Sequence, residues 1–180
     1  MYGLVNNSIA SLVCKQFGEN VWERVQQRAG LELELFVSNQ SYPDEHTYQL
    51  VGAACEELGL EAADFLKRLG EHWVLCTAAE SYGDLLTAGG SSLSEFLENL
   101  PDFHTRIVMI MPALCPPRFE VSHRTEKSLR LHYHSSRTGL APFVCGLLDG
   151  LAQRFHEDVV VTHVAKRDDG ASHDEFQIEW

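Results

Sequence analysis

The residue whose surroundings most suggest chemistry is His104, which lies in a segment with the spacing of an apolar helix. One and two helical turns away in each direction, every neighbour on its face is apolar: Leu97, Leu100, Ile107, Val108 and Met111. A neutral imidazole there has no polar partner on its own helix face, and an unpaired buried polar group costs roughly 1–3 kcal/mol. Two interpretations stay open: a core histidine bonded to a backbone carbonyl, or an imidazole that binds haem iron while its apolar neighbours pack on the porphyrin.

A second set of residues recurs at every other position, as side chains on one face of a strand do: Leu129, Leu131, Tyr133, Ser135 and Arg137. This face begins apolar and ends in three hydrogen-bond donors, one of them a guanidinium that can grip a carboxylate with two bonds. Such a row suits an anion with two acidic arms, such as haem, or alternatively a phosphate or dicarboxylate. Alternatively, Arg137 lies at the exposed end of a strand and has no binding role.

The other face of the same strand is polar, with Arg130, His132 and His134 among its residues. His132 and His134 form an H-x-H pair of the kind that binds metals. Because the sequence offers no evident third ligand, we expect this face to be exposed to solvent.

Helical periodicity dominates the part of the chain that precedes these strands, and it predicts helices over 3–17, 19–28, 44–58, 62–77, 80–87 and 93–111. Asp44 is the expected N-cap of the third helix and Gly59 its end. Pro101 predicts a kink or a new helix start three residues before His104, because proline removes a backbone donor.

Alternation and turn residues then predict strands over 119–124, 128–136, 159–166 and 175–180, with a helix over 141–154 between the second and third. The fold class is therefore α+β, with a helical N-terminal part and a four-stranded antiparallel sheet that carries a packed helix.

Composition narrows the range of functions. The chain has 180 residues and a formal net charge of −12, which suits a single domain and disfavours nucleic acid as a partner. We expect no membrane segment and a cytoplasmic location, because the sequence has neither an apolar run of about 18 residues nor a signal-peptide pattern at its start. Five dispersed cysteines, with no C-x-x-C spacing, indicate free thiols.

Several spaced motifs, in order, resemble the H-NOX family of haem-nitric oxide/oxygen binding domains, relatives of the haem domain of soluble guanylate cyclase. They are Met1–Asn6, Gly70–Trp73, Met111–Phe119, Tyr133-x-Ser135-x-Arg137 and Gly139–Pro142. The likeness runs from Met1 to Trp180 and is greatest for the bacterial stand-alone NO-sensor branch. It implies one H-NOX domain over 1–180, with a distal helical subdomain over about 1–60, a proximal part with the sheet over 61–180, and haem buried between.

The resemblance also implies roles for individual residues. The cofactor would be haem b, with His104 as the proximal iron ligand, Tyr133, Ser135 and Arg137 on the propionates, and Pro117 pressing on the porphyrin. The remaining residues expected at the haem are apolar or aromatic: Leu4, Val5, Trp73, Leu100, Met111, Phe143 and Leu147. Some members carry a zinc site of cysteines and a histidine in the C-terminal half, which we do not expect here because only Cys145 follows Cys115.

Function follows from the same resemblance. Oxygen-binding members place a tyrosine in the distal pocket, whereas the matching stretch here, 140–144, has none. The expected function is therefore a sensor, not an enzyme, which binds NO and CO, excludes O2 and signals to a separate histidine kinase of two-component signalling or to a cyclic di-GMP synthase or phosphodiesterase. The alternatives are an enzyme with His104 as base, or a haem-free binding module, either using the Tyr133/Ser135/Arg137 face for an anionic ligand.

Overall fold

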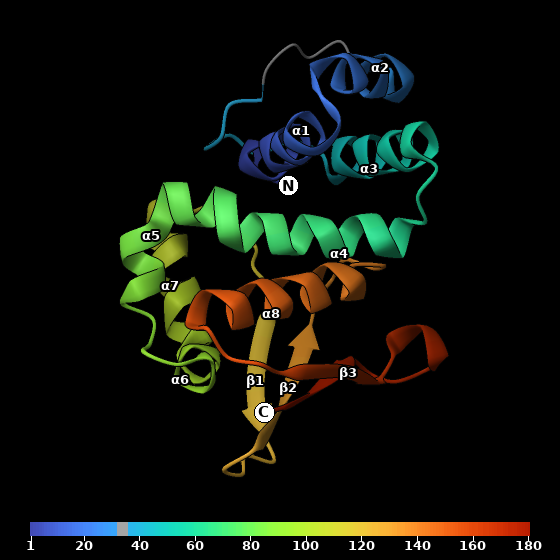
Figure 1. The fold of residues 1–180 in the computed structure, drawn as a ribbon. Helices are drawn as coiled ribbons and strands as arrows, with labels where there is room; N and C mark the ends of the chain where they lie inside the picture. Colours follow the sequence, from blue (N-terminus) through green and yellow to red (C-terminus); the bar gives the residue numbers. More distant parts are fainter. Residues whose placement is uncertain (32–35) are drawn as a thin grey trace.

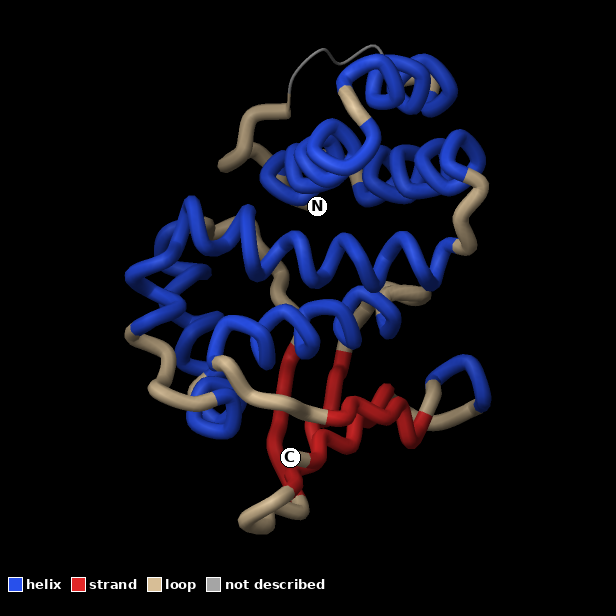
Figure 2. Tube along the Cα trace, viewed as in Figure 1, coloured by secondary structure: helices blue, strands red, loops and turns tan. Residues whose placement is uncertain are grey.

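The computed structural model describes residues 1–31 and 36–180, and it confirms the predicted α+β fold class. Helices form most of the chain up to residue 110, and an antiparallel sheet follows (Figures 1 and 2). The first part contains α1 (Gly3–Phe17), α2 (Glu19–Ala29), α3 (Asp44–Leu58), α4 (Ala62–His72), a π-helical turn η1 (Trp73–Ala78), α5 (Ala79–Thr87), α6 (Leu93–Glu98) and α7 (Leu100–Ile110). The second part contains β1 (Arg118–Ser122), β2 (Ser128–His134), α8 (Ala141–Phe155), β3 (Val160–Ala165), a 3-10 turn η2 (Arg167–Asp169) and β4 (Asp174–Glu179).

Two large clusters make up most of the described hydrophobic core, and helix α4 lies where they meet. In Figure 1 it runs between α1 and α3 on one side and α8 on the other. Phe65, Leu66 and Leu69 of α4 belong to a cluster with α1, α2 and α3. The second cluster joins α8 to the sheet and to η1 and α6, with Val144 and Leu148 among its α8 members. The two helices α4 and α8 therefore connect the helical layer to the sheet layer.

Small residues allow α4 and α8 to approach closely. A Cβ added at Gly146 would lie 1.9 Å from the Lys67 carbonyl oxygen, and one added at Gly70 would lie 2.2 Å from the Phe143 carbonyl oxygen. Any larger side chain at either position would collide with the backbone of the other helix. Only glycine therefore fits at these two points of contact between α4 and α8.

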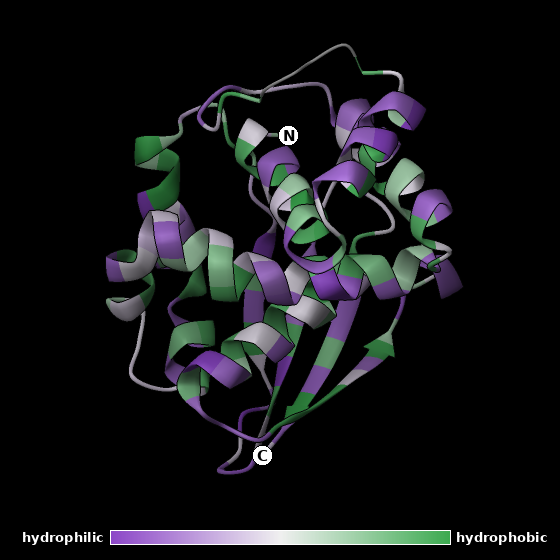
Figure 3. Ribbon diagram, turned by 45° about the horizontal axis from the view of Figure 1, so that its top comes forward, coloured by the Kyte–Doolittle hydropathy of each residue, from purple (hydrophilic) through white to green (hydrophobic). Residues whose placement is uncertain are grey.

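The sheet has the strand order β1-β2-β4-β3, and every neighbouring pair is antiparallel. Buried and partly exposed residues alternate along β2, with Leu129, Leu131 and Tyr133 buried. Hydrophobic and hydrophilic bands alternate along the strands in Figure 3. One face of the sheet therefore packs against α8, and the other carries the polar residues.

Proline and glycine set the element boundaries as predicted. A new helix, α7, starts at Leu100, directly before Pro101, so that the proline occupies a position where no backbone donor is needed. Gly59 ends α3 in the left-handed conformation, with φ of 64°. The prediction that Asp44 is the N-cap of α3 is wrong: Asp44 is the first residue of the helix, and Pro43 flanks it.

Across the described residues, no helix combines the length and the hydropathy that a bilayer crossing requires.

Candidate haem-binding site

An apolar cavity of about 100 Å³ lies at the point where η1, α7, α8 and the sheet meet. Its lining is almost entirely aliphatic and aromatic, and it includes four residues predicted from the sequence: Trp73, Leu100, His104 and Leu147. The π-helical turn, a rare geometry that is frequent at functional sites, carries Trp73 into this wall. Among the described residues of the lining, only His104 has a titratable side chain, so His104 is the candidate for any acid–base or metal-binding role in this cavity.

The imidazole of His104 has aromatic and backbone neighbours. Its ring centre lies 5.6 Å from that of Phe119, which in turn lies 5.3 Å from the ring of Tyr133. Burial lowers the pKa of His104, an effect that the backbone carbonyl of Pro117 partly offsets. Such a carbonyl can hold one ring nitrogen as a donor and leave the other free as an acceptor, which is the arrangement that metal-ligating histidines use.

The described residues give His104 no charged neighbour that shifts its pKa. A catalytic histidine base is usually oriented by a carboxylate, and none fills that role here. The geometry therefore suits a ligand imidazole better than a general base.

The predicted polar row begins on β2 and continues past its end. Tyr133 is buried on the face toward α8, but β2 ends at His134, so the expectation that Ser135 and Arg137 belong to the same strand face is wrong. The loop after β2 turns at Ser135, whose hydroxyl accepts a hydrogen bond from the Arg137 backbone N–H at 3.0 Å. Tyr133 and Arg137 nevertheless line a common polar pocket, which begins two positions along β2 from Leu131 of the apolar cavity.

Arg137 forms a two-hydrogen-bond ion pair with a carboxylate of the protein itself, that of Asp44. Its Nε donates to Asp44 Oδ2 at 2.7 Å, and one terminal nitrogen donates to Oδ1 at 3.3 Å. The other terminal nitrogen donates to the Cys115 carbonyl at 3.2 Å. The amino group of Met1 also contacts Asp44 Oδ1, at 2.5 Å. Hydrogen bonds from Arg137 hold the pKa of Asp44 below its ordinary value. Sequence reasoning assigned Asp44 only a capping role, and no local signal pointed to this pairing across the fold.

Three of the remaining predicted residues, Phe143, Leu4 and Met111, lie around Trp73. Phe143 meets its indole edge-on, with ring centres 6.4 Å apart. Leu4 and Met111 are buried in a small cluster that packs against the same indole. Val5 is half-buried on α1, and Pro117 is half-buried in the segment before β1.

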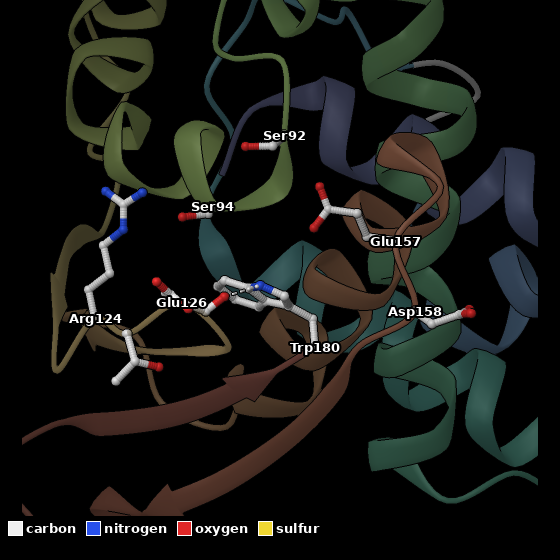
Figure 4. A pocket seen from close by; sticks show the side chains of 8 residues that line it. Ser92, Ser94, Arg124, Glu126, Glu157, Asp158 and Trp180 are labelled. Carbon is white, nitrogen blue, oxygen red and sulfur yellow. Dashed lines mark hydrogen bonds between the residues drawn. The ribbon is translucent and has the colours of Figure 1, made fainter.

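A larger hollow, of about 490 Å³, lies away from all of these residues (Figure 4). It is open and of mixed polarity, and two of its lining residues already form hydrogen bonds: the Trp180 indole donates to the Glu126 carbonyl at 3.1 Å, and Glu157 accepts from the Leu93 backbone N–H at 2.9 Å. This hollow offers no imidazole or apolar wall for a cofactor.

The polar face of β2 departs from expectation. His132 and His134 are half-buried, not fully exposed to solvent, and both contact His173, with ring centres 5.1 and 4.1 Å away respectively. The third histidine comes from the segment before β4, which the sequence alone does not bring near β2.

Comparison with known proteins identifies the family. The family model described as haem-NO-binding (HNOB) matches residues 2–163. Soluble guanylate cyclase gcy-35 of Caenorhabditis elegans is 29% identical over 171 residues, which cover 93% of this chain and 25% of that protein. Soluble guanylate cyclase gcy-31 of the same organism is 25% identical over 161 residues, covering 89% of this chain and 23% of the relative. The chain thus spans about a quarter of the length of these cyclases.

Solved structures agree with the fold. The crystal structure of an H-NOX protein from S. oneidensis in the Fe(II)NO ligation state superimposes with a TM-score of 0.90 at 22% identity, covering 99% of this chain and 98% of that one. A mutant H-NOX protein from K. algicida, in the Fe(II) unliganded state, gives a TM-score of 0.82 at 25% identity, covering 99% and 96%. With a family model that matches nearly the whole sequence, this chain belongs to the haem-NO-binding (H-NOX) family.

Proposed function

We propose that this chain binds haem b through His104 and senses NO. The observation that carries this proposal is a single imidazole set in an otherwise apolar cavity, with a row of donors that begins at Tyr133, two residues along β2 from Leu131 of the cavity wall. An apolar ring with two carboxylate arms matches that arrangement at both ends.

The fit is good in chemistry and tight in volume. A cavity of about 100 Å³ is smaller than the roughly 300–1,000 Å³ of common cofactor pockets, so its walls must separate for a porphyrin to enter. Leu100 and Leu147 belong to that wall. Tyr133, Ser135 and Arg137 would hold the propionates, and a propionate at Arg137 would share or replace the carboxylate of Asp44.

Ligand choice would follow from the polarity of the wall. When bound, ferrous haem would supply an iron that can take a diatomic gas. A hydrogen-bond donor beside the gas favours O2 far more than it favours NO or CO. Trp73, Phe143 and Leu147 would provide ring and aliphatic surface beside it, with the indole N–H as their one donor, and no tyrosine hydroxyl lines the described cavity. We therefore expect binding of NO and CO with exclusion of O2.

Signal output requires a catalytic partner. The curated relatives are cyclases of which this chain matches only a part, so we propose that it reports to another catalytic protein or domain, such as a histidine kinase or an enzyme of cyclic di-GMP metabolism. We propose two subdomains, about 1–60 and 61–180, that can shift relative to each other; α4, which belongs to the second, packs Phe65, Leu66 and Leu69 into the hydrophobic cluster of the first. Arg137 and Asp44 link them, because one lies after β2 and the other begins α3.

Absorption spectroscopy tests this function. Protein purified with haem and reduced without oxygen should change its Soret band when NO is added and should keep it unchanged during a brief exposure to air. A prompt spectral change in air that reverses under argon would contradict the exclusion of O2. An unchanged spectrum with NO would contradict the sensor function.

A further inference from the structure

The polar face of the sheet, opposite α8, carries a cluster of metal-binding side chains that haem binding does not use. His132 lies on β2 directly across from Glu175 of β4 in the antiparallel register. His173 precedes β4 by one residue and thus reaches the same face. All three side chains are about four-fifths buried, with exposures of 17%, 21% and 18% for His132, Glu175 and His173.

The ligand atoms form a triangle of suitable size. His132 Nδ1 lies 2.8 Å from His173 Nε2, and Glu175 Oε1 lies 3.7 Å and 3.5 Å from these two nitrogens. Bonds of about 2.0–2.1 Å to a tetrahedral Zn²⁺ place its ligand atoms about 3.3 Å apart. Two sides of the triangle already lie close to that value, and the third needs to open by about 0.5 Å. We propose that His132, His173 and Glu175 form a binding site for a divalent transition-metal ion, with water as the fourth ligand.

Hydroxyl groups hold both imidazoles in the required orientation. His132 Nε2 lies 2.6 Å from the Ser122 hydroxyl, and His173 Nδ1 lies 2.8 Å from the Ser172 hydroxyl. Ser122 can accept from His132 because its own hydrogen can go to His123 Nδ1, 2.8 Å away. When both outer ring nitrogens donate to these hydroxyls, the two inner nitrogens present their lone pairs to a cation; without a cation, one inner nitrogen donates to the other across the 2.8 Å contact. Metal-ligating histidines are held in this way by a partner on the second nitrogen.

The donor set indicates which ions the site prefers. Two imidazole nitrogens and one carboxylate oxygen suit Zn²⁺ and its transition-metal neighbours, whereas Mg²⁺ and Ca²⁺ prefer oxygen ligands alone. The second oxygen of Glu175 faces Arg130 at 3.4 Å, which leaves Oε1 toward the imidazoles. His134 stacks on His173 and encloses the site on one side. The ligands include no cysteine, so the site differs from the cysteine-based zinc site of some family members.

A bound ion would fasten β2 to the segment before β4. Tyr133 lies between His132 and His134 on β2, with its side chain on the opposite face of the sheet. Because binding to the native state alone stabilises that state, Zn²⁺ should raise the melting temperature.

Calorimetric titration of the full chain, as purified, with Zn²⁺ tests the site. A Cys115→Ser background removes the one exposed thiol among the five cysteines as a competing ligand. We expect one Zn²⁺ per chain, and no competition from Mg²⁺. His132→Ala or His173→Ala should weaken the affinity by more than the roughly 10- to 100-fold expected when a supporting group such as Ser172 is lost. Glu175→Gln, which keeps the shape of the side chain, should also weaken it.

His156→Asn is the matched control. It removes an exposed imidazole at the end of α8, and asparagine tolerates the left-handed backbone found there. This variant should bind Zn²⁺ as the parent does. Far-UV circular dichroism confirms that each variant folds, and Zn-edge anomalous diffraction locates the ion. Parent protein that binds no Zn²⁺, equal affinity in the folded ligand variants, or an ion located elsewhere would each overturn the proposal.

Discussion

The close contact between α4 and α8 makes Gly146→Ala a sharp test of the packing that positions the cavity. The added Cβ would lie 1.9 Å from the Lys67 carbonyl oxygen and 2.8 Å from its carbon. Ordinary contacts begin at 3.4 Å, so the helices must separate by about 1.5 Å. The obstructing atoms belong to the backbone and cannot rotate away. We therefore take the upper end of the usual overpacking cost, about 3 kcal/mol.

Alanine also favours helix over glycine by about 1 kcal/mol, which offsets part of that cost. The net expectation is a loss of about 2 kcal/mol in the free energy of unfolding, measured by urea denaturation. Gly52→Ala is the matched control, because Gly52 is an exposed α3 residue with no atom within 4 Å of its added Cβ, and it should gain about 0.5–1 kcal/mol. Equal unfolding midpoints for the two variants would refute the helix contact as described.

Three further results follow from the site. Phe143→Tyr should add a hydrogen-bond donor beside Trp73 and raise the O2 affinity, measured from absorption spectra in air. An unchanged O2 affinity would contradict the proposed position of Phe143 beside the bound gas. Asp44→Asn should reduce stability by about 0.5–1 kcal/mol at pH 7, as expected for a partly exposed bidentate pair. Because the folded pKa of Asp44 is lowered, its contribution exists above the unfolded pKa of about 3.9 and disappears as the pH falls through the folded pKa, so denaturation curves of variant and parent should converge in acid. Leu131→Ala should cost about 2–5 kcal/mol in urea denaturation, because it enlarges a buried cavity; a smaller cost would indicate that the wall collapses.

Periodicity predicts the α-helices and strands of the fold, with their approximate bounds. The alternation of Leu129, Leu131 and Tyr133 identified the buried face of β2, and Pro101 marked the start of α7, because both effects act within a few residues. The π-helical turn at Trp73 was not predicted, since its pattern of apolar residues is compatible with an α-helix.

The sequence alone does not predict which polar side chains pair across the fold. Arg137 was expected to bind a carboxylate, but nothing within its own segment indicates that Asp44, 93 positions away, provides one. The H-x-H pair of His132 and His134 lacked a third ligand for the same reason: His173 becomes a neighbour only when β4 pairs with β2. Charged and polar partners depend on tertiary contacts, whereas secondary structure depends mainly on local spacing.

We expect a single imidazole, that of His104, to anchor haem in the apolar cavity. Titration of the protein with hemin, followed at the Soret band, measures this most directly, with His104→Gly and the α3 variant His46→Gly compared at equal concentration. We predict saturation at one haem per chain for the parent and for His46→Gly, and loss of the iron–imidazole spectrum for His104→Gly. Protein that stays colourless and does not respond to hemin, or an unaltered spectrum in His104→Gly, would contradict the account.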